Sequence, residues 1–197
     1  MSKSYYDLNA ECFIENTVSL DMNAIYDPFL RKLSLHSRIL DAGCGTGRDT
    51  LAFSKMGYQV TAFDGSKKMV ETACEITGHK VLHCDFSEFT SNFEFDGIWA
   101  CASLLHVPRE KLESTLRSLS ENLRTEGVFY ASFKYGSLER QKGTRYFNDM
   151  NEQQLFEVVN KIKSLEVYQI WKTKDQRPDR SSEMWLNCLL RVKRITG

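Results

Sequence analysis

Residues 41 to 47 carry an acid followed by three glycines at alternate positions, Asp-Ala-Gly-Cys-Gly-Thr-Gly. A short apolar run precedes the acid, and the residues after the last glycine have the pattern of a helix. Glycine is needed where the backbone takes a positive φ or lies against a ligand, and the first turn of a helix offers unpaired N–H groups. The stretch therefore predicts a strand, a tight turn and a helix N-terminus that together bind a small molecule.

The charge of Asp41 restricts which ligand this turn can accept. A dinucleotide places its pyrophosphate on such a turn, and a carboxylate two residues before the first glycine would repel that group. The glycines also follow the spacing G-x-G-x-G and not G-x-G-x-x-G. A cationic amine or sulfonium would be attracted by the same carboxylate. We therefore expect a positively charged ligand with no phosphate at the turn, which disfavours an NAD-dependent dehydrogenase.

The segment from Asp41 to Gly47 resembles the first motif of the class I methyltransferases that use S-adenosylmethionine (SAM). Within that superfamily the chain is most similar to the small single-domain enzymes grouped with the tellurite-resistance-type methyltransferases. The resemblance covers about residues 5–193. It implies an enzyme with SAM as cofactor and S-adenosylhomocysteine (SAH) as product, while the motifs leave the methyl acceptor unidentified.

Acids after two further strands match the order found in this family. Asp64 ends the apolar segment 59–63, about 20 residues after the glycine turn, where an acid accepts hydrogen bonds from ribose hydroxyls. Asp85 and Phe86 follow the segment 80–84 and resemble the pair that holds adenine. The residues expected to bind the cofactor are Tyr6, Asp41, Gly43, Cys44, Gly45, Arg48, Asp64, Gly65, Met69, Asp85, Phe86, Ala100 and Cys101.

For two of these residues, a structural role is an alternative to cofactor binding. Arg48, in the first helical turn, either reaches the carboxylate of the methionine part of SAM or is a surface arginine. Tyr6 either lines the cofactor pocket or packs on the edge of the sheet. The sequence does not decide between these alternatives.

Residues 102–108 follow the fourth predicted strand, where the family places groups beside the transferred methyl. The resemblance puts Ser103 and Leu104 against the acceptor, and we add Arg145 and Tyr146 from a later segment. His106 is our candidate general base because the unperturbed pKa of histidine lies near neutrality. The alternative is that His106 only orients the loop before Pro108. The six cysteines lack C-x-x-C spacing, so we expect no metal site.

These residues must be positioned by alternating strands and helices. The repeated order predicts parallel strands with helices on both faces, and two final strands, about 165–172 and 184–193, are expected to pair antiparallel at one edge. The predicted fold is an α/β, Rossmann-like doubly wound sheet of seven strands, mostly parallel with an antiparallel last strand. The other expected elements are strands at 38–41, 59–63, 80–84, 95–101 and 128–133, and helices at 21–33, 48–56, 66–77, 110–123 and from 151.

With 197 residues and 42% hydrophobic content, the chain is expected to form one domain, 1–197. We interpret residues 1–34 as a helical lead-in and residues 134–150 as a lid loop near the acceptor, since long loops inside a compact domain are usually functional. No apolar run approaches the roughly 18 residues of a membrane helix, and the N-terminus has no apolar signal core. We therefore expect a cytoplasmic monomer or homodimer without membrane contact.

Charge is unevenly distributed although the net charge is zero. Residues 134–197 hold 13 Lys and Arg against 8 Asp and Glu, and the reverse excess lies before them. We hypothesise a small, anionic methyl acceptor; the alternative is a solvated basic face. The basic residues expected to overhang the acceptor are Lys134, Arg140, Lys142, Arg145, Arg177 and Arg180.

Two other function classes remain open. A methyltransferase acting on tRNA or another nucleic acid would need a contiguous basic patch with exposed aromatic residues, which zero net charge does not favour. A SAM-binding regulatory protein without catalysis would bind SAM but show no turnover. A small-molecule acceptor is favoured because no substrate domain is appended to the chain.

Overall fold

The computed structural model describes residues 5–7, 20–177, 180 and 182–193. Residues 1–4 and 8–19 of the predicted N-terminal lead-in lie outside this set. Among the described residues, no helix combines the length and the apolar character needed to cross a membrane.

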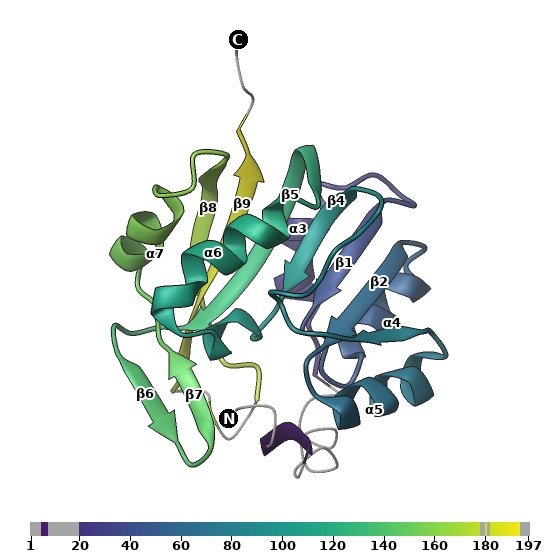
Figure 1. Cartoon of the computed structure of the whole chain (residues 1–197), viewed down its shortest axis with the longest axis horizontal. Helices are drawn as coiled ribbons and strands as arrows, with labels where there is room; N and C mark the ends of the chain where they lie inside the picture. The colour runs from purple at the N-terminus through teal and green to yellow at the C-terminus, as the bar shows by residue number, and fades with distance from the viewer. Residues whose placement is uncertain (1–4, 8–19, 178–179, 181, 194–197) are drawn as a thin grey trace.

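Seven strands form one sheet in the order β3-β2-β1-β4-β5-β9-β8 (Figure 1). The pairs from β3 to β5 are parallel, and β9 runs antiparallel to both of its neighbours. The predicted fold class is therefore confirmed. The strands are β1 Arg38–Ala42, β2 Gln59–Asp64, β3 Val81–His83, β4 Phe95–Ala100, β5 Leu123–Lys134, β8 Leu165–Lys174 and β9 Met184–Val192.

Helices cover both faces of this sheet. Strand residues alternate between the two cores: Ile39 and Trp99 pack with α3 and α4, whereas Leu40 and Ile98 pack with α6 and α7. This alternation follows from the opposite directions of successive side chains in a strand. The helices are α3 Asn23–Leu30, α4 Arg48–Lys55, α5 Lys67–Thr77, α6 Arg109–Ser120 and α7 Glu152–Val159, with a short 3₁₀ turn, η1, at Leu104–His106.

Local capping signals set several helix ends. The Ser66 side chain accepts the Met69 N–H at the start of α5, and Gly78 closes that helix with a φ of 69°. Asn151 and Gln154 form a reciprocal capping box at the start of α7, as their spacing predicts. Helix α6 stops at Ser120, earlier than predicted, because Leu123 already belongs to β5.

Residues 134–150 are not the loop that composition suggested. They contain an antiparallel hairpin of β6 (Glu139–Lys142) and β7 (Arg145–Asn148). The two-residue turn between these strands includes Gly143, whose φ is 61°, and such a turn is itself a hairpin signal. In Figure 1 the hairpin extends beyond the carboxyl ends of the parallel strands, on the same side as residues 5–7. A lid role for it stays a prediction.

Candidate active-site cleft

A cleft of about 740 Å³ opens at the carboxyl edge of the sheet. Its walls come from the glycine turn after β1, the ends of β2 and β4, the hairpin, the β8–β9 connection and Tyr6. Ligands of open α/β sheets bind outside the carboxyl ends of the strands, and pockets for small molecules have volumes of roughly 300–1,000 Å³. The cleft is therefore large enough for a nucleoside-sized ligand together with a small second molecule.

Glycine is required at particular positions of the turn between Gly43 and Gly47. Gly43 and Gly47 have φ values of 77° and 82°, in the left-handed region. A Cβ on Gly43 would lie 2.6 Å from the Cβ of Ser103. Ser103 is fixed there because its hydroxyl donates to the Ala42 carbonyl at 2.7 Å. Position 43 therefore has no room for a side chain.

Asp64 is held against this turn by backbone donors. Its carboxylate accepts the N–H of Gly45 at 2.9 Å and the N–H of Ser66 at 2.8 Å. Burial raises the pKa of Asp64, and these two hydrogen bonds oppose the rise. A carboxylate has about four acceptor sites, so the group retains capacity for two ligand hydroxyls. Asp85 and Phe86 line the same wall.

Asp41 is buried beneath the turn, with 2% of its surface exposed. It accepts the hydroxyl of Thr50 at 2.6 Å. Burial, reinforced by the nearby charge of Asp49, raises the pKa of Asp41 to about 8. Burial thus favours the neutral carboxyl in the free protein, and a cation placed beside it would favour the ionised form.

The Arg48 side chain is held in place by Asp49, the next residue in the sequence. Its Nε and Nη2 donate to the two oxygens of Asp49 at 2.6 and 2.9 Å. Asp49 also accepts the Tyr26 hydroxyl at 2.6 Å and Trp99 Nε1 at 2.8 Å. Arg48 lines the cleft with 20% of its side chain exposed, so the alternative of a surface arginine is wrong. Contact with the methionine carboxylate of SAM stays a prediction.

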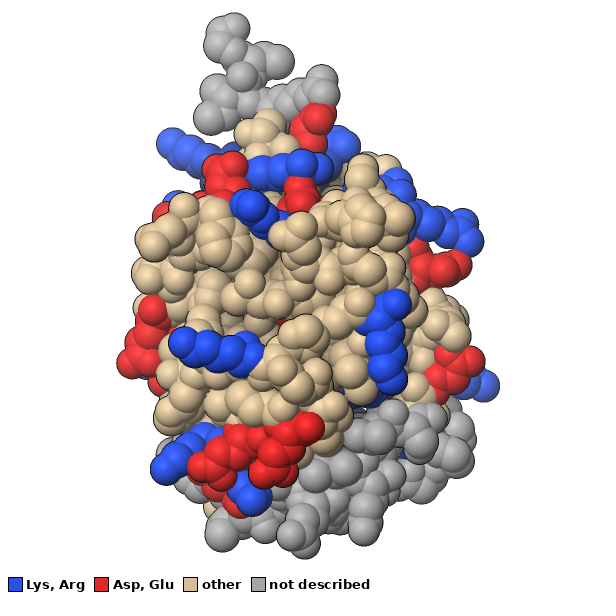
Figure 2. Space-filling view, turned by 90° about the vertical axis from the view of Figure 1, so that its right-hand side faces the viewer, with Lys and Arg blue, Asp and Glu red and all other residues tan. Residues whose placement is uncertain are grey.

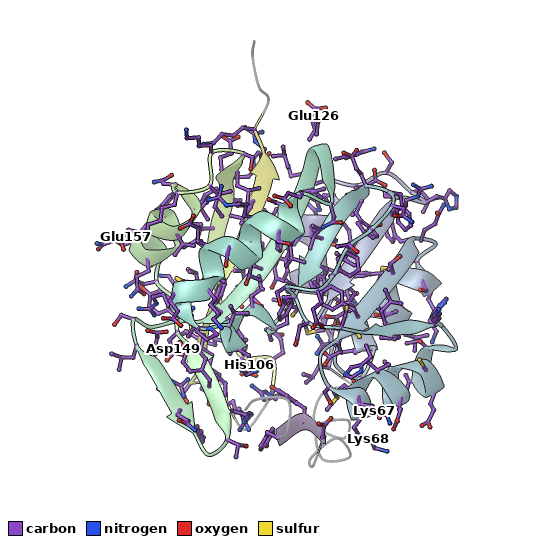
Figure 3. All side chains as sticks on the ribbon, viewed as in Figure 1. Lys67, Lys68, His106, Glu126, Asp149 and Glu157 are labelled. Atoms are coloured by element: carbon purple, nitrogen blue, oxygen red, sulfur yellow. The ribbon has the colours of Figure 1, made fainter. Side chains whose placement is uncertain are left out.

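His106 joins the N-terminal segment to the hairpin (Figure 3). The Tyr6 hydroxyl lies 2.8 Å from Nε2, and the Tyr146 carbonyl lies 2.7 Å from Nδ1. Because a carbonyl can only accept, Nδ1 carries the proton, and Nε2 accepts from Tyr6. Both ring nitrogens are therefore engaged, which favours the orienting role of His106 over the role of general base. Tyr6 lines the cleft and does not pack on the sheet edge.

We predict that the His106 ring stays neutral throughout the pH range in which the protein is folded and active. The net pKa of His106 is lowered to about 4: burial is the main cause, the Arg145 charge acts in the same direction, and the hydrogen bond to the Tyr146 carbonyl opposes both. An NMR titration of labelled histidine should show one imidazole, absent in His106→Gln, that does not titrate between pH 5 and 8. A midpoint near 6.5 for that signal would restore His106 as a base.

Most of the residues predicted for the site do line the cleft, and two do not. Ala100 and Leu104 are fully buried in the core that contacts α6 and α7. Ala100 ends β4 on the face that also carries Ile98, as the alternation of strand side chains requires, and Leu104 begins η1 in the same core. Their neighbours Cys101, Ala102 and Leu105 line the cleft. The predicted residues found on the wall are Tyr6, Asp41, Gly43, Cys44, Gly45, Arg48, Asp64, Gly65, Met69, Asp85, Phe86, Cys101, Ser103, His106, Arg145 and Tyr146.

Polar residues inside apolar strands form a part of the wall that the sequence analysis missed. Asn187 of β9 accepts the Tyr130 hydroxyl at 2.7 Å and donates to the Thr173 hydroxyl at 3.0 Å. Ser132 of β5 accepts the N–H of Ala102 at 2.8 Å and holds that residue at a φ of 52°. A lone Asn or Ser within an otherwise hydrophobic strand was the available signal.

Charges are separated within the cleft. The glycine-turn half carries Asp41, Asp64 and Asp85, together with the ion pair of Arg48 and Asp49. The half formed by β5, the hairpin and the β8–β9 connection carries Lys134, Arg145 and Arg180, together with the ion pair of Arg177 and Asp175. Of the six basic residues singled out from the sequence, Arg140 and Lys142 do not line this cleft. On the face that Figure 2 presents, the side of α4 and α5, the charged residues surround a largely uncharged centre and form no continuous basic area among the described residues.

Comparisons with known proteins agree with this architecture. Residues 39–127 match the family described as "Methyltransferase domain". A curated relative, the malonyl-(acyl-carrier protein) O-methyltransferase of Buchnera aphidicola, is 33% identical over 129 residues, which make up 64% of this chain and 51% of that protein. The chain thus spans about half the length of that relative.

Two solved structures share the fold at low sequence identity. The 1,6-didemethyltoxoflavin-N1-methyltransferase of Burkholderia thailandensis is 22% identical with a TM-score of 0.77, covering 96% of this chain and 84% of that one. A TehB-like SAM-dependent methyltransferase of Corynebacterium glutamicum is 19% identical with a TM-score of 0.73, covering 96% and 100%. Residues 39–127 are therefore similar to a methyltransferase domain, and the whole chain shares the fold of SAM-dependent methyltransferases, a TehB-like protein among them.

Proposed function

We propose that the protein transfers a methyl group from SAM to a small anionic acceptor. The observation that carries this proposal is the separation of charge within one cleft. A cationic cofactor suits the half with Asp41, Asp64 and Asp85, and an anionic acceptor suits the half with Lys134 and Arg145. Opposite potentials at the two ends also favour one orientation of each ligand over the reverse.

The residues of the cofactor half fit SAM in shape and in chemistry. Gly43 lets the turn pack directly against Ser103, because a Cβ there would lie 2.6 Å from the Ser103 Cβ. Asp64 would accept from the ribose hydroxyls, Asp85 and Phe86 would hold the adenine, and Asp41 would face the positive charge of the methionine part. The cleft volume of about 740 Å³ leaves room for an acceptor beside the cofactor.

Catalysis by this chain would rest on alignment and exclusion of water. SAM supplies an electrophilic methyl group on a sulfonium. Tyr6 and the hairpin would close the cleft over the acceptor, and Arg145 would orient it, so that its nucleophilic atom lies at roughly 3 Å from the methyl. Because both nitrogens of His106 are engaged, an acceptor that arrives deprotonated suits the site better than one that must lose a proton.

A thermal-shift series tests the cofactor assignment. SAM and SAH should raise the melting temperature by mass action, and NAD should not. Asp64→Asn should weaken SAH binding about 100-fold, since two charge-assisted hydrogen bonds are lost. The exposed Glu75→Gln variant, which removes the same charge on α5, should behave as wild type. A shift by NAD and not by SAH would contradict the assignment.

The acceptor class is tested by following SAH release with pooled small molecules. Anionic pools should give turnover, while neutral pools and tRNA should not. Turnover with tRNA that falls steeply with salt would support the nucleic-acid alternative. SAH binding without turnover in any pool would support the non-catalytic alternative.

A further inference from the structure

A second pocket of about 330 Å³ lies between the hairpin β6–β7 and the β8–β9 connection. Five basic residues line it, against two acids. Its walls therefore carry a formal excess of positive charge, in a chain whose net charge is zero. The five bases are Lys134, Arg140, Lys142, Arg145 and Arg180.

Both acids of the second pocket are already paired with a base. Glu183 forms an ion pair with Lys134. Asp149, at the end of the hairpin (Figure 3), accepts Arg140 Nε at 2.6 Å and Nη2 at 3.1 Å. The acids therefore neutralise only part of the positive charge on the pocket wall.

An aromatic ring holds two guanidinium groups together in this wall. The Arg140 and Arg145 guanidinium carbons lie 4.7 and 5.3 Å from the centre of the Phe147 ring. Arg145 also lies over the Tyr5 ring at 4.1 Å. Cation–π contacts of this kind fix the direction of a guanidinium group without neutralising its charge. Arg145 is thus oriented but keeps its charge available to a ligand.

Arg145 has a buried donor that the protein does not satisfy. Its Nε is inaccessible and has no hydrogen-bond partner among the described residues. An unsatisfied buried donor is costly, and a ligand oxygen would remove that cost once the side chains that cover the Nε have moved aside. The same residue lines the main cleft as well as the second pocket.

The electrostatic environment of Lys134 agrees with an excess of positive charge. The net pKa of Lys134 is lowered to about 8: burial is the main cause, the charges of Arg177, Arg180 and Arg140 act in the same direction, and Asp175 opposes them. Lys134 lines both cavities. An anion held between these cations would relieve their mutual repulsion.

We propose that the second pocket binds an anionic group, a carboxylate or a phosphate, of the acceptor whose methyl-accepting atom lies in the main cleft. Lys134, Arg145 and Arg180 line both cavities, so one elongated molecule can reach from one to the other. The proposal rests on the proposed function and narrows the acceptor to a molecule with an anionic end distant from its nucleophile.

Calorimetric titration with inorganic phosphate and with malonate, at constant ionic strength, tests the second pocket. Both probes should bind saturably, and the ratio of their affinities identifies the phosphate or the carboxylate as the natural group. Arg145→Gln should abolish binding. Lys142→Gln, whose side chain lines this pocket and not the main cleft, should weaken it about three- to tenfold. Lys163→Gln, the same charge change at an exposed site, should leave it unchanged.

The titration is repeated with saturating SAH to separate this proposal from the proposed function. Undiminished phosphate binding in the presence of SAH is expected, because the two ligands would occupy different cavities. Competition with SAH would overturn the proposal by placing the anion at the glycine turn. Equal loss in Lys142→Gln and Lys163→Gln, or no saturable binding, would also overturn it. The cofactor assignment is tested separately by whether SAH binds at all, whatever the result with phosphate.

Discussion

Replacing Asp49 with alanine is expected to lower the free energy of unfolding by about 3–5 kcal/mol, because it leaves a buried charge without its partner. Asp49 is 6% exposed and accepts hydrogen bonds from Arg48, Tyr26 and Trp99. Tyr26 and Trp99 are buried, so water cannot replace the lost carboxylate at these two donors, while Arg48 lines the cleft with 20% of its side chain exposed. Denaturant unfolding followed by tryptophan fluorescence measures the loss.

Two matched variants separate loss of charge from loss of contacts. Asp49→Asn keeps a hydrogen-bond acceptor but removes the charge, and should fall between wild type and Asp49→Ala. The double variant Arg48→Met with Asp49→Leu removes both charges and should lose much less than Asp49→Ala alone, since no charge is stranded. A loss below about 1 kcal/mol in Asp49→Ala would show that Arg48 reaches solvent and that its pairing with Asp49 is unimportant.

The acid dependence of stability gives an independent check on Asp49. Burial raises its pKa, but the Arg48 charge and the three donors outweigh burial, so the net pKa is lowered from the ordinary value of 3.8. An acid whose folded-state pKa is lowered contributes stability above pH 3.8, which is lost as the pH falls through the folded value. Wild type should therefore lose more stability than Asp49→Ala on acidification through this range.

The strands, the glycine turn and the acids at strand ends were predictable because their signals are local. Asp41 and Asp64 each end an apolar run, and the turn between 43 and 47 needs glycines wherever φ is positive. Parallel strands then bring their carboxyl ends to one edge. The cofactor half of the cleft could therefore be predicted from these local signals together with the resemblance to the methyltransferase motifs, apart from Ala100, whose side chain lies on the opposite face of β4.

The partners of individual side chains were not predictable because they are far apart in the sequence. His106 could be a base by its residue type, but Tyr6, 100 residues away, and the Tyr146 carbonyl occupy its ring nitrogens. Trp99 donates to Asp49 across 50 residues. Such contacts depend on the packing of helices on the sheet, which periodicity does not encode. The hairpin at 139–148 was not predicted, because the polar composition of the segment is typical of a loop and the only hairpin signal is Gly143 at the turn.

The second large effect is expected for Asp41→Asn, which should weaken SAM binding but stabilise the folded protein at alkaline pH. Asp41→Asn should weaken SAM binding about 10- to 100-fold, because a buried carboxylate facing a cation is lost. Wild type should also release protons on binding SAM near neutral pH, since burial raises the pKa of Asp41 and a neighbouring cation would lower it. Calorimetry in buffers of different ionisation enthalpy measures this release, and Asp41→Asn should release none.

The same substitution should stabilise the free protein at alkaline pH. A carboxyl whose folded-state pKa is raised from 3.8 to about 8 favours folding at low pH, and that contribution is lost as the pH rises between the two values, at up to about 1.4 kcal/mol per pH unit. Asn keeps the hydrogen bond from Thr50 without this penalty. Asp41→Asn should therefore exceed wild type in unfolding free energy at pH 8.5, whereas Glu75→Gln should not. Equal stabilities at pH 8.5 would mean that Asp41 is already ionised in the free protein, and the proton release would then be absent as well. The buried Asp41 carboxyl therefore lowers the stability of the free protein at high pH. In return, its charge would attract the cationic part of SAM more strongly than a solvated carboxylate would, because water does not screen it.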